Sequence, residues 1–158
     1  EKCGYPGMKI LQFAFDSREE SDYLPHNYKK NCVVYTGTHD NDTTAGWYKA
    51  LDKKDKDFAK RYLHITVKEE AEWEFIRAAL ASVADTAIIP MQDYLGLGAE
   101  ARINIPSTLG INWKWRMGDK DCTKRLADRI YKICKLYGRI RGKEETSEQK
   151  KTSVKKAE

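Results

Sequence analysis

The sequence lacks the features of a membrane or secreted protein. It has no long apolar run and no segment with the apolar core of a signal peptide. Its four cysteines form no CxxC pair and have no spacing suited to a zinc site, so we expect free thiols. These absences predict a cytoplasmic protein of the reducing cytosol that contacts no membrane and binds no metal.

A strong charge of one sign is also missing from most of the chain. The formal net charge of +5 would by itself suggest an acidic partner such as nucleic acid. Residues 139–158, however, hold seven Lys/Arg and four Glu, so +3 of this charge lies there and only +2 in residues 1–138. Because residues 139–158 are almost devoid of apolar side chains, we expect them to form a disordered, charged tail. We therefore expect no nucleic acid partner.

The length of 158 residues is that of an ordinary single domain, and 41% hydrophobic residues are enough to bury a core. The chain begins at Glu1, and its first methionine is Met8. We therefore expect it to be part of a longer protein.

Three short apolar runs have the composition of buried strands, namely 8–15, 32–36 and 86–91. None of them alternates between polar and apolar residues, which is typical of a parallel sheet that is covered by helices.

Helical patterns occupy the stretches after the second and third of these runs. The sequence predicts helices over 46–62, 70–84 and 121–137. Thr66 and Glu69 have the spacing of a capping box before the second helix, which should be largely buried, and Gly138 is placed to end the third. The order of elements predicts an α/β fold built from βα units.

Polar side chains that could carry chemistry follow each predicted strand. They are Asp16 after the first strand, His39 and Asp40 after the second, and Gln92 and Asp93 after the third. Because the C-terminal ends of parallel strands meet at one face, this is where βα enzymes place their working residues. The group around His39 and Asp40 is the densest and offers donors and acceptors for a polyhydroxylated ligand.

Two other interpretations of His39 and Asp40 remain open at this point. Asp, Asn and Thr also favour turns and helix N-caps, so one alternative is that the whole group only binds the backbone of a turn and a helix N-terminus. A metal-dependent phosphohydrolase of the HD type would need further ligands, and the other histidines, His26 and His64, are poorly placed for that role.

Five longer segments point to one family: GMKILQFAFD, YLPHNY, VVYTGTHDNDTTAGWY, ALASVADTAIIPMQDYLGLGAEARIN and NWKWR. In this order they resemble motifs of the amylomaltases, the bacterial counterparts of plant disproportionating enzyme, which are 4-α-glucanotransferases of glycoside hydrolase family 77. The resemblance covers roughly residues 4 to 138. It implies a (β/α)8 TIM barrel of which 1–138 would be the C-terminal part, about the last three βα units.

The resemblance also implies a reaction without a cofactor. Members transfer an α-1,4-glucan segment to the 4-hydroxyl of an acceptor glucose or maltooligosaccharide by retaining double displacement. Asp40 would be the carboxylate that stabilises the transition state, while His39, Phe13 and Asn104 would bind substrate. The nucleophile and the acid/base would lie on the missing N-terminal part of the barrel, so this chain alone should be inactive.

Each of these assignments has a plainer alternative. For Phe13 the alternative is a place in the barrel core, and for Asn104 it is the ordering of its own loop. Trp113 and Trp115 could be sugar platforms, but their alternation predicts that one of them is buried, and we do not place them in the site. For the whole protein, the rival functions are an α-amylase-clan hydrolase and a non-catalytic carbohydrate-binding fragment.

Overall fold

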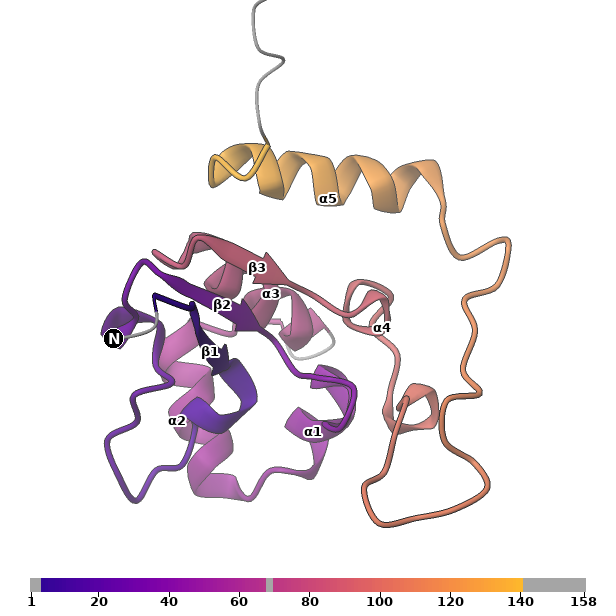
Figure 1. The fold of residues 1–158 in the computed structure, drawn as a ribbon, viewed down its shortest axis with the longest axis horizontal. Helices are drawn as coiled ribbons and strands as arrows, with labels where there is room; N and C mark the ends of the chain where they lie inside the picture. Colours follow the sequence, from indigo (N-terminus) through magenta and orange to yellow (C-terminus); the bar gives the residue numbers. More distant parts are fainter. Residues whose placement is uncertain (1–3, 68–69, 141–158) are drawn as a thin grey trace, which may run out of the picture.

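A parallel three-stranded sheet forms the centre of the molecule. The computed structural model describes residues 4–67 and 70–140. Strands β1 (Gly7–Ile10), β2 (Cys32–Tyr35) and β3 (Thr86–Ile88) lie in the order β1-β2-β3. Met8 pairs with Val33, which pairs with Thr86 on its other side. The predicted α/β class with a parallel sheet is confirmed, and Figure 1 shows the three strands side by side.

The first and third strands are shorter than predicted. After Ile10 the chain turns into a 3-10 helix, Leu11–Ala14, so the strand prediction for 11–15 was wrong. Leaving the sheet lets the backbone N–H of Gln12 donate to Thr36 O over 3.2 Å. The third strand ends before Pro90, which has no N–H for a ladder and precedes the short helix α4 (Met91–Tyr94).

The predicted helix over 46–62 is in fact two helices, α1 (Thr44–Ala50) and α2 (Lys53–Leu63). Leu51 has an extended ψ of 144°, which interrupts the helical hydrogen bonds. Asp52 then begins α2 as its N-cap, since its side chain accepts from Asp55 N.

Helix α3 (Ala71–Ala81) lies within the predicted range and is buried over most of its length, as expected. Its N-cap is Glu70, which makes no side-chain capping bond, whereas Glu69 of the predicted capping box lies outside the described residues. The fully buried Phe75 packs edge-on against Phe15 and Trp47, each with ring centroids at 5.4 Å. This aromatic cluster joins α1, α3 and the end of the 3-10 helix Leu11–Ala14 into one core.

Helix α5 (Lys124–Leu136) lies beyond β3 in Figure 1 and packs on α3 through Ile133. It begins at Lys124 and not at the predicted 121, because Thr123 is its N-cap, and Gly138 follows its C-cap Tyr137 as predicted. Gly138 has a φ of 66°, and the N–H groups of Gly138 and Arg139 donate to Lys135 O and Cys134 O.

The guanidinium of Arg139 then donates to the carbonyls of Leu80, Ser82 and Ala84. Arg139 is thus fastened to the end of α3, although the sequence placed it in the tail. The remainder of that predicted tail, 141–158, lies outside the described residues.

The two faces of the sheet differ in their cover. Cys32 and Val34 point to the face beneath the helices and are buried. Met8 and Ile88, on the opposite face, are 58% and 44% exposed. The described helices therefore leave Met8 and Ile88 exposed on this face, although Ile10 on the same face is buried.

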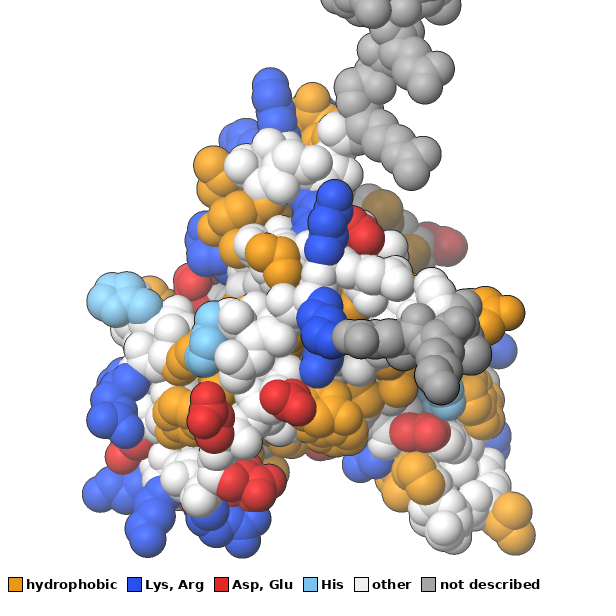
Figure 2. Space-filling model, turned by 60° about the vertical axis from the view of Figure 1, so that its left-hand side comes forward, with side chains coloured by type: hydrophobic (Ala, Val, Ile, Leu, Met, Phe, Trp, Pro, Cys, Tyr) orange, Lys and Arg blue, Asp and Glu red, His pale blue; other side chains and the backbone are white. Residues whose placement is uncertain are grey.

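The rest of the described chain is loop with two short 3-10 turns, Pro25–Asn27 and Ala99–Ala101. On the face drawn in Figure 2, hydrophobic side chains lie among Lys, Arg, Asp and Glu. No helix in the described part of the chain is long and apolar enough to cross a membrane.

Candidate functional site

A hollow of about 690 Å³ opens at the C-terminal ends of the strands, over the uncovered sheet face. We call it the strand-end hollow. Apolar side chains from all three strands form its wall: Met8, Ile10, Tyr35 and Ile88. Phe13, the polar loop from Gly37 to Asn41, the segment 90–92 with the predicted strand-end residue Gln92, and Ile103 complete it. Its combination of an apolar wall and a polar edge suits a ligand with hydroxyl groups on a flat body.

The polar loop begins with a close approach at a glycine, where a side chain would require Gln12 to shift. A Cβ at Gly37 would lie 2.6 Å from Gln12 Nε2. Gln12 is 4% exposed, and its Nε2 donates to Asp42 O over 2.9 Å. The turn after β2 is therefore pressed onto a buried amide, which holds the following residues at the hollow.

Within this loop, most of the polar side chains serve the backbone. Asn41 Oδ1 accepts from both the N–H and the hydroxyl of Thr38. Asp42 Oδ1 accepts from Thr43 N, and Thr43 is the N-cap of α1 through Gly46 N. The turn and N-cap interpretation is thus correct for these four residues.

His39 and Asp40 are not used in that way. Their side chains are 54% and 51% exposed and line the hollow. Asp40 Oδ1 accepts from Asn104 Nδ2 over 2.6 Å, and His39 Nε2 lies 3.3 Å from the same oxygen. Among the described residues Asp40 Oδ2 has no hydrogen-bond partner. One oxygen of the carboxylate is held by protein groups, and the other is available to a ligand.

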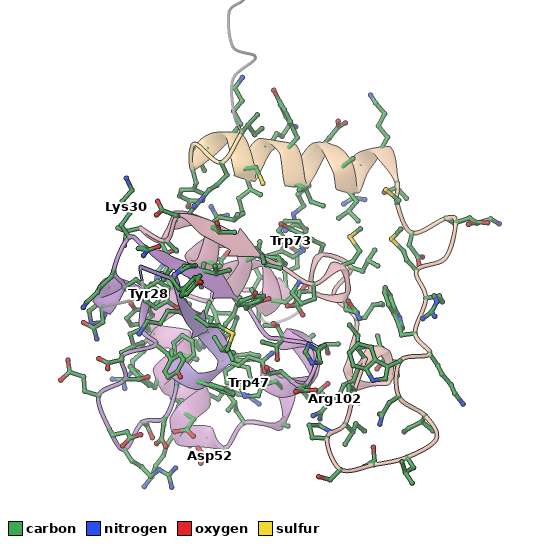
Figure 3. All side chains as sticks on the ribbon, viewed as in Figure 1. Tyr28, Lys30, Trp47, Asp52, Trp73 and Arg102 are labelled. Carbon is green, nitrogen blue, oxygen red and sulfur yellow. The ribbon has the colours of Figure 1, made fainter. Side chains whose placement is uncertain are left out.

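A second loop fixes this pair from the far side. Asn104 N donates to His39 O over 3.1 Å. The guanidinium of Arg102 donates to Asp40 O over 2.6 Å and to Asn104 O over 2.9 Å. Figure 3 shows Arg102 near α1, where the two loops meet. The plainer alternative, that Asn104 only orders its own loop, is too narrow, because its side chain reaches Asp40. Asn104 itself is not among the residues that line the hollow, so its predicted contact with a sugar stays a prediction.

Phe13 lines the hollow and is not part of the hydrophobic core of the described chain. It is 50% exposed and packs edge-on against Tyr23, with ring centroids 5.7 Å apart. The neighbouring Phe15, in contrast, is 2% exposed and belongs to the aromatic cluster. Phe13 is therefore outside the core of the described residues, and its ring is exposed at the hollow.

The carboxylates after the other two strands do not share this position. Asp16 forms an ion pair with Arg18, whose side-chain hydrogen bond lowers the pKa of Asp16 to about 2. Asp16 does not line the strand-end hollow. Of the three predicted strand-end carboxylates, only Asp40 faces it.

Asp93 is a buried structural group. It is 1% exposed and accepts from Thr36 Oγ1, Thr44 N and Thr44 Oγ1 at 2.5, 2.8 and 2.8 Å. Burial raises the pKa of Asp93, although these hydrogen bonds act in the opposite direction. Asp93 ties the end of β2 to the start of α1, and the neighbouring Gln92 donates to Ala101 O over 3.2 Å.

Sequence reasoning missed two residues of the site. Arg102 contacts Asp40 across 62 positions, a separation that no local pattern reveals. Trp113 stacks on His39, with ring centroids 5.2 Å apart and a tilt of 36°. The expectation that one of the two tryptophans of NWKWR is buried is wrong for the described chain, because Trp113 is 56% exposed and Trp115 is partly exposed.

The other histidines lie away from this site. His26 Nδ1 is 2.8 Å from Tyr62 Oη, and His64 ends α2 in a left-handed conformation. No group of three or more His, Cys, Asp or Glu in residues 4–67 and 70–140 is arranged to hold a metal ion. The ligand set that an HD-type phosphohydrolase requires is therefore not assembled in the described part of the chain.

The sequence is similar to those of known 4-alpha-glucanotransferases. The model of the 4-alpha-glucanotransferase family matches residues 1–121. The chain is 52% identical over 140 residues to a 4-alpha-glucanotransferase of Clostridium butyricum, covering 88% of this chain and 29% of that protein. It is 48% identical over 143 residues to the chloroplastic/amyloplastic 4-alpha-glucanotransferase DPE1 of Arabidopsis thaliana, covering 89% and 25%.

The structure leads to the same relatives. It matches an amylomaltase from Streptococcus agalactiae, solved in complex with acarbose, with a TM-score of 0.84 and 38% identity. That match covers 90% of this chain and 28% of the amylomaltase. The chain thus spans between a quarter and a third of the length of these relatives, and it belongs to the 4-alpha-glucanotransferase family.

Proposed function

We propose that this chain is the C-terminal part of the catalytic barrel of a 4-α-glucanotransferase, contributing about the last three βα units of a (β/α)8 fold. The observation that carries the proposal is the pair His39 and Asp40 at the end of a parallel strand, with one oxygen of Asp40 held by Asn104 and the other free in the described chain. The enzyme would transfer α-1,4-glucan segments to glucose or maltooligosaccharides in the cytoplasm.

The uncovered sheet supports an incomplete barrel. Met8 and Ile88 are exposed on the face opposite the helices, and within residues 4–67 and 70–140 β1 and β3 each have one edge without a partner strand. A closed barrel would bury these side chains inside it and pair both edges. The remaining strands would come from the part of the protein that the relatives have and this chain does not.

Asp40 acts in this proposal as a stabiliser of the transition state. Transfer with retention passes through an oxocarbenium-like state, in which the ring flattens and its hydroxyls become stronger donors. Asp40 Oδ2 would accept from two neighbouring hydroxyls of the donor sugar as charge develops. Because Asn104 already holds Oδ1, the carboxylate needs no rearrangement at that moment, which favours the transition state over the ground state.

His39 and Phe13 bind the sugars around the cleaved bond. His39 would share ring hydroxyls with Asp40, since its Nε2 lies 3.3 Å from Asp40 Oδ1. The half-exposed ring of Phe13 would stack on the acceptor sugar and help to keep water from the glycosyl intermediate. The nucleophile and the acid/base would be supplied by the preceding strands of the barrel.

The experiment is a maltotriose disproportionation assay with the full-length enzyme. We expect wild type to produce glucose together with longer maltooligosaccharides, and Asp40→Asn to lose roughly 100-fold or more in kcat at unchanged KM, as for loss of one electrostatic stabiliser. Asp119→Asn, a matched change on the exposed loop, should be as active as wild type.

The products separate this function from its rivals. Hydrolysis products without chain lengthening would indicate an α-amylase-type hydrolase instead, and near-normal turnover by Asp40→Asn would remove Asp40 from the mechanism. The isolated 158-residue chain should release no glucose. Glucan binding without any turnover by the full-length protein would favour a non-catalytic binding role.

A further inference from the structure

Trp113 combines two properties that are unfavourable for a tryptophan. Its backbone has a φ of 64°, in the left-handed region that bulky residues rarely adopt, and its side chain is 56% exposed. Neither burial of the indole nor an intrinsic backbone preference explains this conformation. Left-handed residues of this kind persist where the surrounding contacts impose them, and they cluster at ligand sites.

The contacts around Trp113 hold its indole ring over the site. The backbone N–H of Trp113 donates to Ile103 O over 2.8 Å, and the backbone carbonyl of Trp113 accepts from Arg116 Nη1 over 3.0 Å. The indole lies against the imidazole of His39, with centroids 5.2 Å apart and planes tilted by 36°. This separation is within the range of attractive aromatic pairs.

One loop therefore supports both members of the pair. Asn104, next to Ile103 in the chain, holds Asp40 Oδ1, and Trp113 packs on His39. The imidazole of His39 is 54% exposed, so few other contacts restrict its rotation. Without the indole, the ring would be free to turn away from Asp40.

We propose that Trp113 is a positioning residue, which keeps the His39 imidazole beside Asp40 and directed at the hydroxyls of the donor sugar. This inference rests on the proposed function. The left-handed backbone of Trp113 is then the cost of placing a large ring over His39 from a loop.

Two substitutions of Trp113 in the full-length enzyme test this role. Asn tolerates the left-handed region and removes the indole, whereas Phe keeps an aromatic ring in the same backbone. We expect Trp113→Asn to lower kcat for maltotriose by about 10- to 100-fold, the range for one hydrogen bond to a charged group, with little change in KM. Trp113→Phe should recover most of that loss. Leu109→Asn, at a 97% exposed position of the same loop, is the control and should resemble wild type.

Thermal unfolding separates positioning from a general structural role. Trp113→Asn should unfold at the same temperature as wild type or higher, since backbone strain is relieved. A parallel loss of activity and of melting temperature would show that the indole only supports the fold, and would overturn the proposal. So would wild-type kcat in Trp113→Asn.

A spectroscopic readout decides the contact independently of turnover. In the enzyme labelled with ¹³C at histidine Cε1, the His39 resonance can be assigned from its disappearance in His39→Gln. The ring current of the Trp113 indole should shift the His39 resonance. Trp113→Asn should therefore change its chemical shift, and Leu109→Asn should not. An unmoved resonance would overturn the proposal. If wild type fails to disproportionate maltotriose, the proposed function falls and with it the catalytic purpose of Trp113, while the resonance still tests whether the two rings touch.

Discussion

The amide of Asn104 donates to Asp40 Oδ1 over 2.6 Å, joining two loops that are 64 positions apart in the chain. This bond orients the carboxylate and occupies one of its two oxygens. It also places the amide dipole of Asn104 in a fixed orientation beside the Asp40 carboxylate, whose charge stabilises the proposed transition state. Asn104 is thus part of the catalytic arrangement in the proposed function.

We expect Asn104→Ala to reduce kcat/KM for maltotriose by about 10- to 100-fold, since a hydrogen bond to a charged group is worth roughly 1.5–3 kcal/mol. Asn104→Asp should be worse, because two carboxylates at this distance repel one another. Steady-state assays with the full-length enzyme would measure both changes.

Asn31→Ala serves as the control, since Asn31 is exposed and its side chain donates only to Gly4 O in the described chain. It should keep wild-type activity. If Asn104→Asp were as active as wild type, the orientation of Asp40 by Asn104 would have no part in catalysis.

Phe13 should decide how well an acceptor sugar competes with water. We expect Phe13→Ala to raise the KM for glucose as acceptor by about 2- to 10-fold, the equivalent of one aromatic contact, and to increase the share of hydrolysis. Because Phe13 is 50% exposed, the fold should tolerate the change. The ratio of free reducing ends to transfer products gives the partition.

Phe13→Tyr should stay close to wild type, because it keeps the flat ring. Tyr5→Ala, at an 85% exposed position outside the hollow, is the control for loss of an aromatic side chain. An unchanged partition in Phe13→Ala would show that its ring does not face the acceptor.

Asp93 should make stability depend on pH. Burial raises its pKa in the folded state, so the fold binds this proton more tightly than the unfolded chain does. Its contribution to stability is therefore complete below the unfolded pKa of about 3.9 and is lost as pH rises through the folded pKa. We expect the free energy of unfolding of Asp93→Asn, relative to wild type, to increase between pH 4 and pH 7.

Urea unfolding of wild type and Asp93→Asn between pH 4 and pH 7 measures the difference in their free energies of unfolding. The contributions of other carboxylates cancel in this difference. Asp93→Ala provides the contrast. It should be destabilised by about 1–3 kcal/mol or more at every pH, because the donors at Thr36 and Thr44 lose their acceptor. If the free energy of unfolding of Asp93→Asn relative to wild type instead increased as pH falls, the hydrogen bonds to Asp93 would outweigh the effect of burial on its pKa.

Local patterns were sufficient for the class of fold and for most elements. The run at 32–36 and the helical spacing up to Gly138 are near-neighbour signals, and the structure has β2 and α5 there. The same patterns failed at 11–15 and at Leu51, where one hydrogen bond to Thr36 and one N-cap outweigh hydrophobic spacing. Such bonds depend on groups that the local pattern does not show.

The sequence by itself determined the family and the α/β class, because these depend on the order of residues along the chain. It also predicted His39 and Asp40 as site residues, because parallel strands end at one edge of their sheet. Only the tertiary structure decided which polar groups remain free for chemistry. It places Asp93 in the interior and Asp40 at the hollow, although both follow strands. It also brings Asn104, Arg102 and Trp113 onto the pair. The physical reason is that burial and hydrogen bonds between distant loops depend on how the chain packs. Asp40 and Asp93 are the same residue type and both follow strands, so the local sequence does not show which of them is buried.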